Sequence, residues 1–210
     1  MCIRDSYGTV LYDAQEKIYK MWYQTFNESK ESGGDAASVM ACYATSVDGV
    51  HWDYPNLGIV NYEGNTNNNI IGNYHIMSVF IDDEAPANER YKMFTFLHDW
   101  TNNTYGYMCS ADGIHWTEMG AQVAGADVAN AAWDQTNGQY YAVIKNGTTG
   151  KRDQWTVTAD AMDNWGTPVM ANSLGDLIDM QRCYRPDSYG QGLYERDGVY
   201  IGLNLSLIHI

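Results

Sequence analysis

The chain has 210 residues, of which 45% are hydrophobic and 18% are charged, so we expect a soluble globular protein with a sizeable core and no extensive disorder. Its net charge of −14 disfavours binding to nucleic acids or to anionic membranes. No apolar run is long enough to span a bilayer, which predicts no membrane insertion. The 17 Tyr and 7 Trp, against 4 Phe, favour a sheet-rich fold and a surface suited to sugars.

The two ends of the chain are related to each other at the level of their codons. Residues 205–210 can be encoded by CTGTCTCTTATACACAT plus one base, and the reverse complement of that string, again with one base added, encodes residues 1–6. This inverted repeat resembles the translated ends of a transposase sequencing adapter, so we expect both segments to be scars. Residues 7–204 are then expected to be an internal fragment of one domain whose native N-terminus is missing.

A short segment is repeated along the chain. Residues 43–52 read Tyr-Ala-Thr-Ser-Val-Asp-Gly-Val-His-Trp, residues 107–116 read Tyr-Met-Cys-Ser-Ala-Asp-Gly-Ile-His-Trp, and residues 157–165 hold a weaker third copy. Asp-Gly is a favoured two-residue turn of a β-hairpin, and helical apolar periodicity is absent. Ahead of each copy stands a second hairpin pattern, with an aspartate followed by a tyrosine-rich segment. Each unit is therefore predicted to contain two hairpins.

Two hairpins per unit predict four antiparallel strands. In the second unit we expect strands at 77–82, 91–97, 104–110 and 115–119. A fourth unit is expected to begin at 190–195, to turn at Asp197-Gly198 and to continue through 199–204. Such repeats predict an all-β protein, a β-propeller of four-stranded blades with about three and a half blades present. A row of β-sandwich domains is the alternative, and the absence of linkers argues against it.

Aspartates that recur at the same place in each unit are predicted to be structural. The innermost strand of a propeller blade runs away from the ligand-binding face, so the turn that follows it lies on the opposite face. An aspartate in such a turn, or in the Asp-Gly hairpin, accepts hydrogen bonds from turn amides. The recurring aspartates are Asp13, Asp82, Asp134, Asp48 and Asp112.

Polar residues that do not recur precede the inner strands, on the predicted ligand face. Hydrolysis of a glycosidic bond requires two opposed carboxyl groups, and we predict Asp127 and Asp179 as this catalytic pair. Sugar rings stack on aromatic faces while their hydroxyls bind polar groups. The predicted substrate-binding residues are His75, Asn130, Arg182, Asp187, Tyr74 and Tyr184. For each of these residues a purely structural role, as a loop cap or in an ion pair, is the alternative.

Several segments between residues 7 and 204 resemble bacterial proteins similar to glycoside hydrolase family 32. The resemblance is carried by residues 42–52, by Pro55-Asn56-Leu57-Gly58, by Asn68-Asn69-Ile70 and by residues 89–93. It implies a five-bladed propeller of the arabinanase, levansucrase and invertase group, and a glycosidase that is secreted or periplasmic. The Asn-Asp-Pro, Arg-Asp-Pro and Glu-Cys motifs of family 32 are absent from this sequence. The Ser-x-Asp-Gly-x-x-Trp hairpin is similar to the Asp-box of sialidases, where it is a fold element.

Three functions remain open on the sequence. The leading one is a glycoside hydrolase that cleaves oligo- or polysaccharides by paired-carboxylate catalysis. The second is a carbohydrate-binding propeller without catalysis. The third is a sialidase-like enzyme, which needs three converging arginines, whereas only Arg182 and Arg185 are suitably placed.

The sequence indicates no cofactor and leaves the oligomeric state open. The acidic surface offers oxygen ligands for a structural calcium ion, although no calcium-binding spacing is present. Cys42, Cys109 and Cys183 lack the close spacing of a zinc site or a disulfide framework. We expect them to be small buried apolar residues, with one disulfide left open. The segment 61–73, rich in Asn and Gly, is predicted to be a surface loop.

Overall fold

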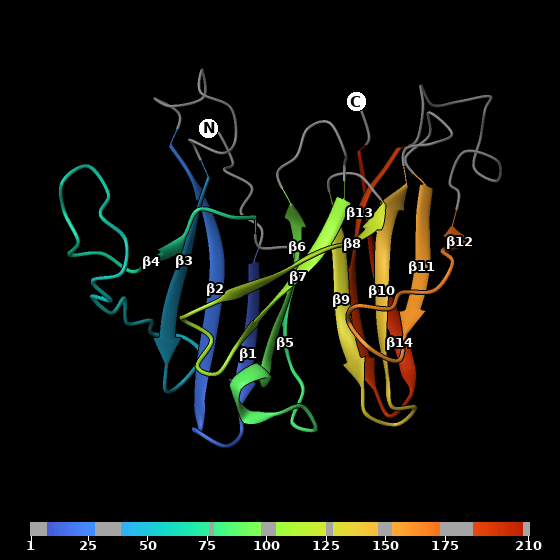
Figure 1. Ribbon diagram of the computed structural model, residues 1–210, viewed down its shortest axis with the longest axis horizontal. Coiled ribbons are helices and arrows are strands. Elements are labelled where there is room, and N and C mark those ends of the chain that lie inside the picture. Colours follow the sequence, from blue (N-terminus) through green and yellow to red (C-terminus); the bar gives the residue numbers. More distant parts are fainter. Residues whose placement is uncertain are drawn as a thin grey trace.

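The structure is a computed structural model that describes residues 8–27, 39–75, 78–97, 104–124, 128–146, 153–172 and 187–207. These residues form three antiparallel sheets of four strands and a last sheet of two strands. In each sheet the strands are neighbours in the order in which they occur along the chain. The sheets stand side by side as blades (Figure 1), and the fold is the predicted β-propeller.

The blades have the following strands. The first blade contains β1 (Gly8–Asp13), β2 (Ile18–Phe26), β3 (Val39–Ser46) and β4 (Ile70–Gly72). The second contains β5 (Ser78–Ile81), β6 (Tyr91–Leu97), β7 (Thr104–Ser110) and β8 (Thr117–Ala124), with a short 3-10 helix at Ala87–Glu89. The third contains β9 (Ala129–Asp134), β10 (Gln139–Asn146), β11 (Asp153–Ala159) and β12 (Val169–Asn172). The fourth sheet contains β13 (Asp187–Arg196) and β14 (Val199–Leu207).

In the second blade, β6 and β7 have the predicted bounds, and β5 (Ser78–Ile81) lies within the predicted range 77–82. β8 ends at Ala124, beyond the predicted end at 119, and it begins at Thr117 instead of His115. The reason is that the backbone N–H of His115 donates to Asp112 Oδ1 at 2.8 Å, which keeps this residue in the turn. In the first blade, β4 lies within the segment that we predicted to be a loop.

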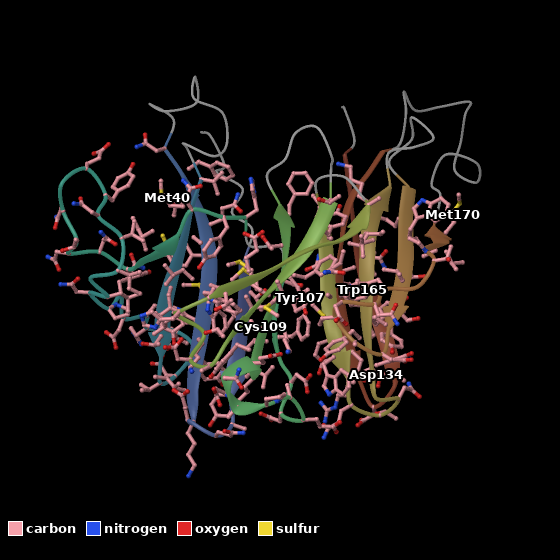
Figure 2. The ribbon with its side chains drawn as sticks, viewed as in Figure 1. Met40, Tyr107, Cys109, Asp134, Trp165 and Met170 are labelled. Carbon is pink, nitrogen blue, oxygen red and sulfur yellow. The ribbon has the colours of Figure 1, made fainter. Side chains whose placement is uncertain are left out.

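The blades are joined by two apolar cores. One lies between the first and second blades, and includes Trp22 and Met93. The other lies between the second and third blades, where Tyr107, Cys109 and Trp165 come together (Figure 2). Cys42 and Cys109 are buried free thiols, as expected. Within the described ranges, no helix has the length and apolar character needed to cross a membrane.

The two Ser-x-Asp-Gly hairpins have the same internal geometry. In the first, Ser46 Oγ accepts the N–H of Gly49 at 2.8 Å, and Asp48 Oδ1 accepts the N–H of His51 at 2.8 Å. The second hairpin repeats both bonds. Gly49 and Gly113 adopt φ values of 73° and 77°, which L-residues with a side chain rarely adopt. These contacts confirm the structural role predicted for the hairpin aspartates.

Only the second hairpin is buried against a neighbouring blade. The indole Nε1 of Trp22 donates to the carbonyl oxygen of Gly113 at 2.6 Å, across the boundary between the first and second blades. A Cβ at Gly113 would lie 2.7 Å from Trp22 Cζ2, whereas a Cβ at Gly49 would lie no closer than 3.5 Å to Tyr19. The first hairpin therefore has room for a methyl group, and the second has none.

We predict that Gly113→Ala destabilises the protein more than Gly49→Ala. Both substitutions impose similar backbone strain, because the two φ values are nearly equal. The difference isolates the clash with Trp22, which we expect to cost a further ~1–3 kcal/mol of unfolding free energy. Urea denaturation of the two variants measures it. Equal losses of stability would show that the boundary between the blades relaxes around the added methyl group.

Candidate functional site

The first strands of the four sheets surround a cavity of about 550 Å³. It is lined by residues 8–12 of β1, 78–81 of β5, 130–133 of β9 and 192–195 of β13. Each of these inner strands pairs with one strand of its own sheet, so its other edge carries backbone groups that the sheet does not use. The volume falls within the range of ligand-binding clefts, roughly 300–1,000 Å³. The cavity is therefore the candidate site.

One register position links each inner strand to the next. Thr9 Oγ1 accepts the N–H of Val79 at 3.0 Å, and Ser78 Oγ accepts the N–H of Ala131 at 2.8 Å. At the same position in β9, Asn130 Nδ2 donates to the carbonyl oxygen of Gln191 at 2.7 Å. These bonds fix the spacing of the strands that form the wall of the cavity.

Three of the predicted substrate-binding residues can be placed in full. Asn130 lines the cavity, with its side-chain nitrogen engaged by β13. His75 is buried with its ring edge-on to Phe96 at 6.1 Å between centroids. The hydroxyl of Tyr74 donates to the carbonyl oxygen of Ile71 at 3.2 Å, and burial raises its pKa. Tyr74 and His75 are not among the residues that line the cavity.

The remaining predicted site residues are described in part or not at all. Asp187 begins β13, where its backbone pairs with Leu207. The other four predicted site residues lie outside the described residues, so their roles stay predictions. These residues are Asp127, Asp179, Arg182 and Tyr184.

The described residue next to Asp127 is firmly held. The carbonyl oxygen of Val128 accepts bonds from the Tyr105 hydroxyl at 3.1 Å and from the Lys145 N–H at 3.2 Å. Val128 immediately precedes β9, whose other end is the turn at Asp134. The chain therefore enters the inner strand from a fixed point at the end of the blade away from that turn.

The recurring aspartates after the inner strands are bound within their turns, as predicted. Asp13 Oδ1 and Asp82 Oδ1 each accept backbone N–H groups two and three residues further along the chain, at 3.0 to 3.2 Å. Asp134 Oδ1 accepts the N–H of Asn137 at 3.0 Å. Figure 2 shows Asp134 near the lower end of the third blade, by the turn.

The second carboxylate oxygen of each of these aspartates binds the next blade. In each case the donor is a tyrosine hydroxyl near the start of that blade's second strand, and we call this bond the inter-blade clasp. The three clasps are Tyr91 to Asp13, Tyr140 to Asp82 and Tyr200 to Asp134. These partners were not predicted from the sequence, although the tyrosine does recur at one register position.

The clasp at Asp13 also includes cations. Arg90 Nη1 lies 2.9 Å from Asp13 Oδ2, and Lys20 Nζ lies 3.4 Å from the same oxygen. Burial opposes ionisation of Asp13, but the hydrogen bonds from Arg90 and Tyr91 outweigh it and hold the pKa of the carboxyl below its usual range. Asp13 is thus ionised at neutral pH, and its carboxylate binds side chains at the boundary between the first and second blades.

In the described part of the chain, the His, Cys, Asp and Glu side chains form no cluster of three or more that could hold a metal ion.

Comparison with known proteins identifies the fold. No protein-family model matches the chain, and no curated protein matches its sequence. Among solved structures, a fructofuranosidase from Schwanniomyces occidentalis complexed with fructosylnystose is similar over 90% of this chain, with 17% identity and a TM-score of 0.59. A Bombyx mori β-fructofuranosidase of glycoside hydrolase family 32 is similar over 95%, with 14% identity and a TM-score of 0.57. The chain spans 36% and 40% of the length of these two proteins.

The clasp at Asp134 predicts a loss of stability in acid. Burial opposes ionisation of Asp134, but hydrogen bonds from Tyr200 and Asn137 outweigh it and lower its pKa. Folding therefore favours the ionised form. The resulting stability is present above the unfolded pKa of about 3.9 and is lost as the pH falls through the folded pKa.

Thermal unfolding between about pH 6 and pH 2.5, which spans the pKa range of carboxyl groups, tests this. We expect Asp134→Asn to lower the unfolding midpoint at pH 6 and to reduce its further decline in acid. Asp160→Asn, at an exposed aspartate, should keep the full decline. If the unfolding midpoint of Asp134→Asn fell in acid as steeply as that of the unmodified protein, the Asp134 carboxylate would not be a source of the acid sensitivity.

Proposed function

We propose that the chain forms part of a glycoside hydrolase that cleaves oligo- or polysaccharides in the cavity between its inner strands. The observation that carries the proposal is the cavity itself, about 550 Å³ in volume and lined by four inner strands. Its size suits one or two sugar rings, and the polar residues of its wall suit hydroxyl groups. The fold, shared with two fructofuranosidases, supports the same class of reaction.

Asp127 and Asp179 are the proposed catalytic carboxyl groups. The recurring aspartates already accept hydrogen bonds from turn amides, and those that follow the inner strands also accept one from a tyrosine hydroxyl. We therefore assign catalysis to aspartates that do not recur. Asp127 is one peptide bond from Val128, which is anchored at the start of β9. One carboxyl group would protonate the leaving oxygen as the glycosidic bond breaks. The other would either attack the sugar carbon, giving an intermediate that water then hydrolyses, or take a proton from the water molecule that attacks that carbon. A separation of about 5 Å between them would give retention, and about 6.5–9.5 Å would give inversion.

Fructosides are the first substrates to test, because the two solved neighbours are fructofuranosidases. Arabino-oligosaccharides form the second group, since the sequence resembles the group that contains arabinanases. The side-chain oxygen Oδ1 of Asn130 would accept a hydrogen bond from a sugar hydroxyl, because the side-chain nitrogen Nδ2 already donates to the carbonyl oxygen of Gln191.

Replacement of the two carboxyl groups tests the proposal. We expect Asp127→Asn and Asp179→Asn each to lower the rate of sugar release by about a hundredfold or more, with oligosaccharide affinity retained. Reducing-sugar assays measure the rate, and calorimetry measures the affinity. The control Asp163→Asn changes an exposed aspartate and should keep full activity.

Two results would contradict the proposal. Undiminished hydrolysis in both variants would remove Asp127 and Asp179 from the mechanism. Oligosaccharide binding without any hydrolysis by the unmodified chain would favour the carbohydrate-binding propeller.

A further inference from the structure

A second cavity lies in the outer part of the first blade. Its volume is about 520 Å³, and it shares no lining residue with the cavity between the inner strands. Its lining comes from β2, from β3, from the start of β4 and from the segment that joins β3 to β4. Met40 of β3, one of the lining residues, lies near the upper end of the first blade (Figure 2).

The connection between β3 and β4 forms one side of this cavity. It contains residues 47–69, whereas the corresponding connection of the second blade contains only residues 111–116. In Figure 1 it extends beyond the outer edge of the first blade. Val60 and Tyr62 of this connection pack against a small apolar cluster in the strands, made of Met40, Cys42 and Ile70. Part of the connection is therefore packed on its own blade, beside the cavity.

Asparagine side chains hold the connection in place. Asn68 Nδ2 donates to the carbonyl oxygen of Val60 at 2.9 Å, and Asn68 Oδ1 accepts the N–H of Ile70 at 3.0 Å. Asn27 Nδ2 donates to the Tyr62 hydroxyl, which joins the end of β2 to the connection. These bonds fix the wall of the cavity before a ligand binds, so less ordering is required on binding.

Asn69 retains one hydrogen-bonding atom for a ligand. Its Nδ2 donates to the Tyr23 hydroxyl at 2.9 Å and to the carbonyl oxygen of Tyr43 at 2.7 Å, which uses both amide hydrogens. Among the described residues, none donates to Asn69 Oδ1. Because Asn69 lines the cavity, this oxygen is available to accept a hydroxyl group there.

The lining of the cavity is uncharged, although the chain has a net charge of −14. None of the ten lining residues in the described part of the chain is Asp, Glu, Lys, Arg or His. Burial raises the pKa of the Tyr23 hydroxyl and of the Cys42 thiol, so both are neutral at pH 7. Aromatic rings and side-chain amides dominate the lining, and these residues are Tyr23, Phe26, Tyr62, Asn27, Asn68 and Asn69.

We propose that this cavity is a second carbohydrate site, which binds a neutral sugar of one or two rings without cleaving it. Sugar rings offer apolar faces to aromatic side chains, and their hydroxyls donate and accept hydrogen bonds as side-chain amides do. The volume suits one or two rings. An acidic sugar would find no cation in the lining and would be repelled by the net charge of the protein. With no carboxyl group in the lining, the site has no acid or base for hydrolysis.

Filling the cavity tests the proposal. Thr25 is an exposed residue of β2 that lines it, and phenylalanine is readily accepted in a strand, so Thr25→Phe should block the cavity and keep the fold. The matched control is Thr158→Phe, at an exposed threonine of β11 in the third blade. Calorimetric titration with sucrose and with arabinobiose measures binding. We expect Thr25→Phe to remove one equivalent of bound disaccharide per chain and Thr158→Phe to remove none.

A second variant keeps the cavity open and removes only the amide. Asn69→Ala deletes the acceptor Oδ1, and we expect it to weaken disaccharide binding at this site by about tenfold. Digalacturonic acid, a charged disaccharide, should not bind at this site in the unmodified chain.

The contrary results are distinct. The proposal is overturned if the unmodified chain binds neither neutral disaccharide, or if Thr25→Phe and Asn69→Ala bind them as the unmodified chain does. Binding of digalacturonic acid that Thr25→Phe abolishes would contradict the assignment to neutral sugars. Binding at this site does not depend on hydrolysis in the cavity between the inner strands. Thr25→Phe should therefore leave the rate of sugar release unchanged, and Asp127→Asn should retain the equivalent that Thr25→Phe removes.

Discussion

The hydrogen bond between an aspartate at the end of one inner strand and a tyrosine of the next blade is the interaction on which the rest of the structure depends. One carboxylate oxygen holds the turn after the inner strand, and the other accepts the phenol of the following blade. Turn geometry and blade position are therefore set by the same side chain. The inner strands, and with them the cavity, are held in register by this constraint.

A buried carboxylate is costly unless it is fully hydrogen-bonded. The chain meets this requirement in spite of its strong excess of acidic residues, since Lys20 and Arg90 lie at the first clasp. At the second and third clasps, tyrosine hydroxyls and turn amides are the partners in the described part of the chain. The burial of Tyr200 and its bond to Asp134 raise its pKa to about 12, so it remains a donor throughout the physiological range.

Local patterns predicted the strands and the turns. β6 and β7 were predicted at their observed bounds because aromatic and β-branched residues recur there between clear turn signals. The clasps were not predicted, because their partners are 58 to 78 residues apart and no local pattern specifies which blades touch. β8 was misplaced, because a histidine after Asp-Gly was assigned to the strand when it still belonged to the turn.

The candidate site could be predicted only in part, for a related reason. Repetition correctly identified structural aspartates, since a turn requires the same contacts in every blade. Asn130 was assigned to substrate binding because its residue type does not recur. The structure shows that its position recurs with Thr9 and Ser78, and that all three link neighbouring inner strands. A comparison of positions, independent of residue type, would have revealed this link from the sequence.

A double-mutant cycle across the clasp between Tyr140 and Asp82 tests the central claim most directly. Unfolding free energies are measured for Tyr140→Phe, for Asp82→Asn and for the double variant. The two residues lie in different blades, and the account predicts a coupling of ~1–3 kcal/mol between them. Additive effects, with a coupling close to zero, would contradict it, because the blades would then be held together by their apolar cores alone.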